Sequence, residues 1–333
     1  MKIIQSNNYD VCIGEKSLGH FNFSDYSTSA ILVDENTKKH CLPLLLAEVS
    51  SLSNSLIIEI KSGEENKNIS TCSLIWEELS KHNFDRNSLL INLGGGVIGD
   101  MGGFSASTYK RGIDFIQIPT TLLAMADASV GGKLGIDFGV LKNQVGLFKN
   151  PKSVLIYPKF LKTLAENQLN SGLAEIVKHA LIADVNLWNE LKETSFSDLN
   201  WQEIIEKSVQ LKNKIILNDP FEKNARKQLN FGHTFGHAIE SYYLEKGTPI
   251  LHGESVFLGI ILELELSNIS RKENSEIKNF ILSNFALPHC PSKSGIAKHL
   301  TNDKKNQSKK INFSLLSGIG NCSIDNLFSI DEL

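Results

Sequence analysis

The sequence predicts an α/β domain with a parallel sheet over residues 1–158, followed by a mainly α-helical domain over residues 159–333. Three observations support this division. At 333 residues, the chain exceeds the length of about 250–300 residues at which a single hydrophobic core stops growing. Short apolar runs alternate with helical patterns in the first half of the chain, whereas helical patterns dominate the second half. Alternating strands and helices are typical of a parallel sheet covered by helices.

The strands of the first domain are predicted from short apolar runs that are bounded by turn residues. These runs cover residues 30–33, 56–58, 89–91, 115–118 and 154–156. The clearest helix between them covers residues 70–80, where Cys72, Ile75, Trp76 and Leu79 follow helical spacing. We therefore expect a buried sheet with helices on its faces.

The second domain is predicted from apolar residues at helical spacing in five segments. The segments are residues 169–181, 201–217, 233–244, 254–267 and 275–285, and a single strand-like run follows at 311–316. The boundary between the domains lies near residues 151–158. The Lys-, Asn- and Ser-rich stretch at 298–310 is predicted to be a surface loop that suits an active-site lid.

Composition excludes several classes of protein. The formal net charge of -3 provides no field that would recruit nucleic acid or an anionic membrane. The 5 cysteines are odd in number and scattered, so neither a disulfide framework nor a thiolate metal site is indicated. The N-terminal sequence lacks a secretion signal, and no apolar run approaches the roughly 18–20 residues that span a bilayer. We expect a cytoplasmic protein that acts on small molecules.

A glycine-rich turn directly follows the predicted strand at 89–93. It reads Gly94-Gly-Gly-Val-Ile-Gly-Asp100, which contains the Gly-x-Gly-x-x-Gly spacing of Rossmann-like dinucleotide-binding domains in the strand-to-helix context that they require. Glycine lets the backbone approach a pyrophosphate, and the next helix offers free N–H groups. A tight turn with packing glycines is the alternative. No acidic residue ends the following strand, so Asp34 and Asn36, after an earlier strand, are the candidates for binding the adenosine ribose.

Polar residues downstream of this turn are suited to phosphate. Thr120 and Thr121 follow a strand and begin a helix, where hydroxyl groups act as helix caps or as phosphate ligands. A second group of charged and amide side chains lies among glycines in an otherwise apolar segment, and its members are Asp127, Lys133, Lys142 and Asn143. Cationic donors beside loose backbone suit a phosphorylated substrate.

Histidines and a carboxylate in the second half suit a metal ion. His233 and His237 are one helical turn apart, and His252 follows the next loop. Zinc prefers such nitrogen ligands together with a carboxylate, for which Glu175 is the best candidate because its neighbours are small or apolar. Ordinary core or surface imidazoles are the alternative. A glutamate is missing after the first histidine, which disfavours a metalloprotease.

Other charged residues are weaker candidates individually. Arg226 precedes Asn230 by one turn, so both could face the same pocket as the histidines. Lys212 and Lys214 lie on a predicted helix whose cationic side chains more commonly face solvent. The run Asp303-Lys304-Lys305 is typical of a solvated loop.

Taken together, these motifs resemble those of the 3-dehydroquinate synthases, a family of sugar phosphate cyclases. The resemblance is continuous from about Leu89 to Gly259 and rests on order and spacing. Its motifs are Gly94–Asp100, Thr108–Gly112, Ile118–Thr121, Asp127–Lys133, Lys142-Asn143, Gly172–Lys178, Asn230–Glu240 and His252–Glu254.

The resemblance implies bound NAD and one divalent metal, zinc or else Co²⁺, in an active site between the two domains of a homodimer. It assigns Glu175, His233 and His252 as metal ligands and moves His237 to the substrate phosphate. The implied nucleotide-binding residues are Asp34, Asn36, Glu64, Lys67, Gly95, Gly96, Asp100, Thr120, Thr121, Asp127, Lys133 and Lys142. The implied substrate-binding residues are Lys133, Lys142, Asn143, Lys178, Lys212, Arg226, Asn230, His237 and Lys304, with Arg111 reaching a phosphate in the partner subunit. Lys214 and Lys305 stay open as alternatives to Lys212 and Lys304.

The implied reaction converts 3-deoxy-D-arabino-heptulosonate 7-phosphate to 3-dehydroquinate and phosphate in the shikimate pathway. Oxidation at C5 by NAD is followed by elimination of phosphate, re-reduction and ring closure, so the enzyme is a lyase without net redox change. The residues leave three alternative functions open. They are another sugar phosphate cyclase, a metal-dependent glycerol-type dehydrogenase that releases NADH, and a non-catalytic metal-binding protein.

Overall fold

The computed structural model describes residues 1–139, 141–300 and 310–333. The chain forms two compact units. Unit 1 comprises Met1–Ala165 and Trp201–Asn213, and unit 2 comprises Glu166–Asn200 and Lys214–Leu333. Within the described residues no helix is both long and apolar enough to cross a membrane.

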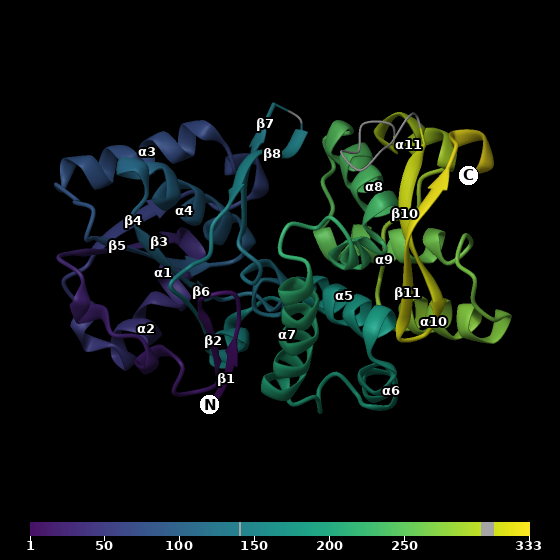
Figure 1. The fold of residues 1–333 in the computed structure, drawn as a ribbon, viewed down its shortest axis with the longest axis horizontal. Coiled ribbons are helices and arrows are strands. Elements are labelled where there is room, and N and C mark those ends of the chain that lie inside the picture. Colours follow the sequence, from purple (N-terminus) through teal and green to yellow (C-terminus); the bar gives the residue numbers. More distant parts are fainter. Residues whose placement is uncertain (140, 301–309) are drawn as a thin grey trace. The chain divides into compact units, whose positions relative to one another are not determined.

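Unit 1 is built on a sheet whose strand order is β1-β2-β9-β6-β5-β3-β4 (Figure 1). Its strands are β1 (Lys2–Gln5), β2 (Asp10–Ile13), β3 (Ser29–Asp34), β4 (Leu56–Ile60), β5 (Leu89–Gly94), β6 (Asp114–Pro119) and β9 (Ser153–Ile156). β1 pairs antiparallel with β2, and the other pairs are parallel. The five strands predicted from apolar runs are confirmed as β3, β4, β5, β6 and β9.

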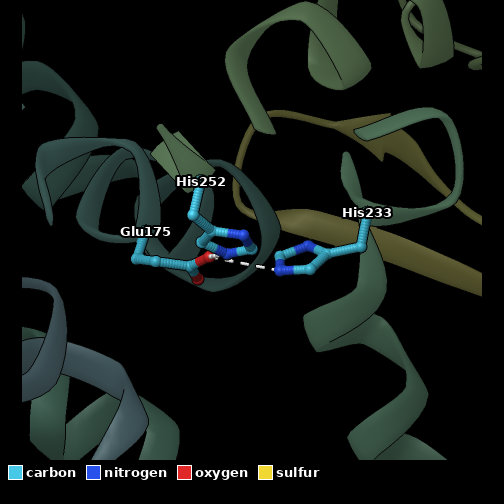
Figure 2. A group of neighbouring side chains, drawn as sticks. All are labelled: Glu175, His233 and His252. Atoms are coloured by element: carbon cyan, nitrogen blue, oxygen red, sulfur yellow. Dashed lines mark hydrogen bonds and ion pairs between the residues drawn. The ribbon is translucent and has the colours of Figure 1, made fainter. Parts of the chain in front are cut away.

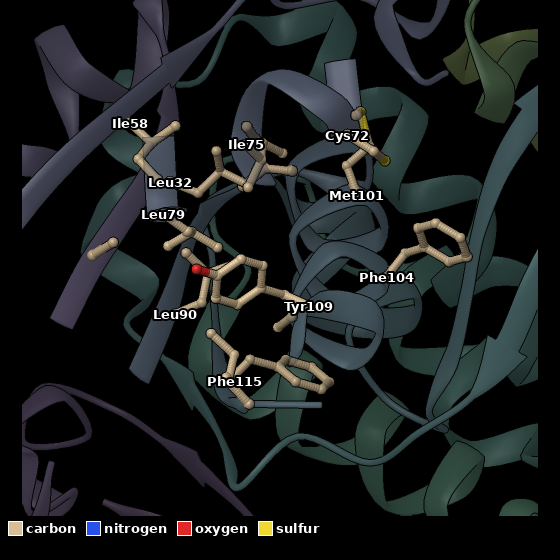
Figure 3. Packing of buried hydrophobic residues seen from close by; sticks show 14 of the residues in the cluster. Leu32, Ile58, Cys72, Ile75, Leu79, Leu90, Met101, Phe104, Tyr109 and Phe115 are labelled. Carbon is tan, nitrogen blue, oxygen red and sulfur yellow. The ribbon is translucent and has the colours of Figure 1, made fainter. Parts of the chain in front are cut away.

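Helices pack on this sheet through a buried apolar cluster. α3 (Ile69–Lys81) and α4 (Gly96–Thr108) contribute Ile75, Leu79 and Met101, which pack against Leu32 and Leu90 of the central strands (Figure 3). The remaining helices of unit 1 are α1 (Glu35–His40), α2 (Leu42–Glu48) and the first part of α7 (Trp201–Asn218). The packing explains the helical spacing of the apolar residues at 70–80.

A second sheet in unit 1 was not expected from the sequence. β7 (Lys133–Phe138) and β8 (Leu141–Phe148) form an antiparallel hairpin, where the glycine-rich sequence indicated loose backbone. Leu134 of this hairpin packs against Gly103 of α4, where a Cβ would lie 2.4 Å from the leucine side chain. Gly146 lies where a Cβ would meet the Leu134 carbonyl oxygen at 2.3 Å. Glycine is therefore present because the backbones approach closely, and not because the segment lacks structure.

Unit 2 is mainly helical, so the predicted fold class is confirmed for both halves of the chain. Its elements are α5 (Glu166–Ala183), α6 (Val185–Glu193), the end of α7, α8 (His233–Glu245), α9 (His252–Glu263), α10 (Arg271–Asn284), α11 (Lys293–Leu300) and the hairpin of β10 (Ile311–Gly318) and β11 (Asn321–Phe328). Phe235 and Ile239 of α8 pack against Ile296 of α11 and Phe313 of β10. The loop predicted at 298–310 is wrong at residues 298–300, which belong to α11, and residues 301–309 lie outside the description.

Candidate functional site

Glu175, His233 and His252 come together in unit 2, each from a different helix (Figure 2). One ligand atom from each residue lies within 4.8 Å of the others. The Nε2 atoms of His233 and His252 each lie 3.2 Å from Oε1 of Glu175. Two imidazole nitrogens and one carboxylate oxygen therefore converge on one point, which is the donor set that catalytic zinc sites use.

The opposite nitrogen of each imidazole faces a hydrogen-bond acceptor. Nδ1 of His233 lies 3.1 Å from the carbonyl oxygen of Phe231, and Nδ1 of His252 lies 3.7 Å from a carboxylate oxygen of Glu240. A proton on Nδ1 leaves the lone pair of Nε2 available for a metal ion. The residues present thus fit a divalent metal in ligand type, in convergence and in the groups that orient them.

Charges around the cluster favour the ionised carboxylate. Burial alone would raise the pKa of the Glu175 carboxyl, but the Lys178 ammonium and the two imidazoles hold that pKa well below its usual range. Lys178 donates a hydrogen bond to Oε2 of Glu175, which leaves Oε1 facing the histidines.

The two imidazoles differ in protonation when no metal is bound. Burial, followed by repulsion from Lys178, lowers the pKa of His233. Burial also acts to lower the pKa of His252, but the carboxylates of Glu175 and Glu240 outweigh it and raise the pKa to about 10. A metal ion must therefore displace a proton from His252, as ligation generally requires.

Close contacts at glycines bring the three helices together. A Cβ on Gly253 would lie 2.2 Å from the carbonyl oxygen of Ser171, so α9 meets the backbone of α5 one turn before Glu175. A Cβ on Gly259 would lie 1.9 Å from the carbonyl oxygen of Gly232, the residue that precedes His233. Ser171 also accepts a hydrogen bond from the N–H of Gly253 at 2.9 Å. The glycines around the histidines are therefore required by backbone packing.

His237 lies beside this cluster but does not belong to the group of converging atoms. Its ring centroid is 5.2 Å from that of His233 and 6.3 Å from that of His252. The side chain is exposed, on the turn of α8 that follows His233.

Arg226 and Asn230 are held in unit 2 by a loop that Asp219 organises. The Asp219 carboxylate accepts hydrogen bonds from the N–H groups of Lys223, Asn224 and Arg226 at 3.0, 2.6 and 3.0 Å. The guanidinium of buried Arg226 donates to the carbonyl of Pro220 at 2.6 Å, and Asn230 donates to Glu222 at 2.8 Å. The arginine side chain is therefore fixed in place by its own loop.

In unit 1 the glycine turn lies at the carboxyl edge of the sheet. Gly94 ends β5, Pro119 ends β6 and Asp34 ends β3, and these three strands are adjacent and parallel. A small hollow is lined by Gly94, Gly95, Gly96, Gly99, Gln117, Pro119, Ala124, Ala128 and Ser129. In open α/β sheets, ligands bind outside the carboxyl ends of the strands.

The polar residues at this edge also serve as helix caps. Asp34 accepts hydrogen bonds from the N–H groups of Asn36 and Thr37 at 2.9 and 2.7 Å, and so caps α1. The Thr121 hydroxyl accepts from the N–H of Ala124 at 3.2 Å, and Thr120 is buried. The Thr121 side chain also lies opposite Gly95, 3.1 Å from the position of a Cβ there. Capping, which the sequence left open for the two threonines, is thus observed for Thr121, and Asp34 also acts as a cap.

Lys67 organises a second polar cluster in unit 1. Its ammonium lies 2.5 Å from the carboxylate of Asp100, 2.7 Å from the amide oxygen of Asn143 and 4.0 Å from Glu64. Lys142 lies 3.6 Å from the same carboxylate oxygen of Glu64. Burial would lower the pKa of Lys67, but Asp100 and Glu64 raise it, so the ammonium stays charged. Five residues expected to bind nucleotide or substrate are therefore brought together.

The other expected residues are placed individually. Lys212 is buried, with its ammonium 2.8 Å from the carboxylate of Asp127, whereas Lys214 is exposed. Lys133 is exposed at the start of β7, and Arg111 is exposed with a φ of 68°. Lys304 and Lys305 lie outside the described residues.

Sequence reasoning missed three carboxylates that contact these groups, of which Glu240 and Glu263 are buried. Asp137 accepts from the N–H of Asn143 at 2.7 Å, Glu240 faces His252, and Glu263 accepts from the backbone beside His233. A charged residue inside an apolar helical run, as in Ile260-Ile-Leu-Glu263-Leu, was the available signal for Glu263.

Comparison with known proteins identifies the family. The profile described as "3-dehydroquinate synthase N-terminal" matches residues 57–171, and the profile described as "3-dehydroquinate synthase C-terminal" matches residues 172–306. The chain belongs to the 3-dehydroquinate synthase family. The 3-dehydroquinate synthase of Parabacteroides distasonis is 40% identical over 309 residues, which cover 90% of this chain and 87% of that protein. The 3-dehydroquinate synthase of a Sulfurovum species is 42% identical over 312 residues, which cover 91% of this chain and 87% of its own length.

Solved structures share the fold of this 3-dehydroquinate synthase family member. The 2-epi-5-epi-valiolone synthase from Streptomyces hygroscopicus subsp. jinggangensis, with NAD+ and Zn2+ bound, is 25% identical with a TM-score of 0.87. The match covers 100% of this chain and 96% of that one.

Proposed function

We propose that the chain catalyses the 3-dehydroquinate synthase reaction, with 3-deoxy-D-arabino-heptulosonate 7-phosphate as substrate. The convergence of Glu175, His233 and His252 on one point carries this proposal, because the motifs that supply these residues are those of the family. Relatives with this name are about 40% identical, whereas the valiolone synthase is 25% identical. The higher identity favours the carboxylated substrate over the neutral sugars of the other cyclases.

Glu175, His233 and His252 would hold a divalent metal, for which Zn²⁺ is the first candidate and Co²⁺ the second. When bound, the metal supplies a Lewis acid that stabilises negative charge on a substrate oxygen. Lys178 keeps Glu175 ionised and occupies its second oxygen, so one carboxylate oxygen faces the ion. Phe231 and Glu240 orient the two imidazoles from behind.

Unit 1 would bind NAD at the carboxyl edge of its sheet. Gly95 and Gly96 begin α4, whose first N–H groups suit a pyrophosphate, and Thr121 lies opposite them. One carboxylate oxygen of Asp34 caps α1, which leaves the other to accept from a ribose hydroxyl. The remaining assigned residues are Asn36, Glu64, Lys67, Asp100, Thr120, Asp127, Lys133 and Lys142.

Cationic and amide side chains would bind the phosphate, hydroxyl groups and carboxylate of the substrate. Arg226 is suited to the carboxylate because its guanidinium is always charged and is held by its loop. His237 is suited to the phosphate because it is exposed beside the metal ligands. The remaining assigned residues are Lys133, Lys142, Asn143, Lys178, Lys212, Asn230 and Lys304, with Arg111 acting across a homodimer.

Phosphate release from the heptulosonate phosphate by the purified protein tests this proposal. We expect release that requires both NAD and metal, is abolished by a chelator, and proceeds without accumulation of NADH. Net NADH formation from a simple polyol would instead indicate a glycerol-type dehydrogenase. Faster turnover of a sugar phosphate that lacks the C1 carboxylate would indicate another cyclase, and metal binding without phosphate release would indicate a non-catalytic protein.

A further inference from the structure

Glu263, the last residue of α9, is buried against the beginning of α8. Its Oε2 atom accepts a hydrogen bond from the N–H of Gly232 at 2.6 Å. Its Oε1 atom accepts from the N–H groups of Thr234 and Phe235 at 3.1 and 3.2 Å. One side chain thus binds three backbone N–H groups around His233.

These donors need a partner from elsewhere in the fold. The first N–H groups of an α-helix have no acceptor within the helix, and a Ser, Thr, Asp or Asn side chain at the N-cap usually supplies one. The N-cap of α8 is Gly232, which has no side chain and a φ of 78°. Glu263 replaces the missing cap, and its charge is favourable at the positive end of the helix dipole.

The same contact fixes the first residue of α8, which is His233. The N–H groups on both sides of His233 are bound to one rigid carboxylate, and Nδ1 of the imidazole faces the carbonyl of Phe231. α9 begins with His252 and ends with Glu263. One helix therefore carries a metal ligand at its first residue and holds the backbone of another ligand at its last.

We propose that Glu263 is a positioning residue of the metal centre, which sets the place of His233 relative to His252 by anchoring the first turn of α8. This inference rests on the proposed metal site. Glu263 does not touch the converging ligand atoms; it acts through the backbone that carries His233. Removing its charge and one acceptor allows the first turn of α8 to move, and the ligand geometry is lost with it.

The test compares Glu263→Gln with Glu273→Gln. Glu273 is the matched control because it also binds backbone N–H groups in unit 2, those of Ser270 and Ile319 at 3.0 and 3.2 Å, at the beginning of α10. Metal affinity is measured by competition with a chromophoric chelator, using Zn²⁺ and Co²⁺, and the visible spectrum of the Co²⁺ protein reports ligand geometry. Thermal unfolding of the metal-free proteins is measured in parallel.

We expect Glu263→Gln to lower metal affinity by about 10–100-fold, which is the usual effect of substituting a residue that orients a metal ligand. The variant should also alter the Co²⁺ spectrum. Glu273→Gln should lose thermal stability while it keeps wild-type metal affinity. Wild-type affinity and an unchanged spectrum in Glu263→Gln would overturn the inference and leave Glu263 as a helix cap alone. Absence of metal binding by the wild-type protein would instead refute the proposed metal centre.

A measurement on the wild-type protein covers the case in which Glu263→Gln does not fold. Coupling between two sites is reciprocal, so metal binding must strengthen the anchor that Glu263 provides. Hydrogen exchange at the N–H groups of Gly232, Thr234 and Phe235 should slow when metal binds. Exchange at the N–H groups of Ser270 and Ile319, which Glu273 binds, should not change. Equal exchange with and without metal at the three α8 positions would contradict the inference.

Discussion

Gly259→Ala tests whether close packing of α8 on α9 builds the metal centre. An added Cβ would lie 1.9 Å from the carbonyl oxygen of Gly232 and 2.7 Å from the backbone nitrogen of Gly236. Ordinary contacts between carbon and a carbonyl oxygen are about 3.3–3.6 Å, so the helices must separate by more than about 1 Å. Both opposing atoms belong to the backbone, so a rotamer change cannot relieve the clash.

The expected cost follows from two opposing terms. Overpacking costs about 1–3 kcal/mol, and the upper part of that range, about 2–3 kcal/mol, applies because both opposing atoms belong to the backbone. Alanine in place of glycine within a helix returns about 1 kcal/mol. The net loss of about 1–2 kcal/mol should lower Tm by about 2–8 °C. The same displacement separates His233 from His252, and a misplacement of about 1 Å can reduce activity by about 100-fold. Thermal unfolding, metal affinity and phosphate release measure these effects.

Gly295→Ala is the matched control, because Gly295 also lies in a helix of unit 2 and its nearest neighbour is the Ser292 side chain at 3.3 Å. This variant should keep wild-type metal affinity and match or exceed wild-type stability. If Gly259→Ala has the Tm and metal affinity of the wild type, the argument from close helix packing is refuted.

Three further predictions concern individual side chains. Glu175→Gln should lower metal affinity by more than about 100-fold, and metal content and phosphate release should fall together; full activity with an unchanged metal requirement would contradict its role as a ligand. Arg226→Ala should raise KM by about 10–100-fold while metal content stays constant, because a charged hydrogen bond contributes about 1.5–3 kcal/mol; an unchanged KM would remove Arg226 from the substrate site. Asp219→Asn should destabilise the protein by about 1–3 kcal/mol at pH 7. Burial would raise the pKa of Asp219, but three backbone N–H groups hold that pKa below its ordinary value. This stabilisation is therefore present above about pH 4, the pKa of an unfolded aspartate, and is lost as pH falls through the lower folded pKa. Denaturant unfolding at several pH values should show the difference from wild type shrinking in acid, and a constant difference would exclude the carboxylate as its source.

The sequence predicted those parts of the fold in which local pattern and tertiary packing agree. α8 and α9 have apolar residues at helical spacing, and β3 to β6 are short apolar runs. The hairpin of β7 and β8 was missed because Gly146 is required by a close contact with the backbone of Leu134, and no local sequence pattern encodes that contact. The candidate metal ligands could be predicted from the sequence because the histidines lie close together along the chain. The contact of Glu263 with the first N–H groups of α8 could not be predicted from the sequence, because these groups belong to another helix.

Unit 1 is not a continuous stretch of chain, since Trp201–Asn213 belongs to it and Glu166–Asn200 does not. The late segment is tied in by Asn213, which donates to the carbonyl of Gln5 at 2.8 Å, and by Lys212 beside Asp127. During synthesis, unit 1 therefore cannot finish folding when its last strand leaves the ribosome, and must wait until residue 213 has emerged. A gene fragment that stops at residue 165 would encode unit 1 without Trp201–Asn213, the part of α7 that belongs to it.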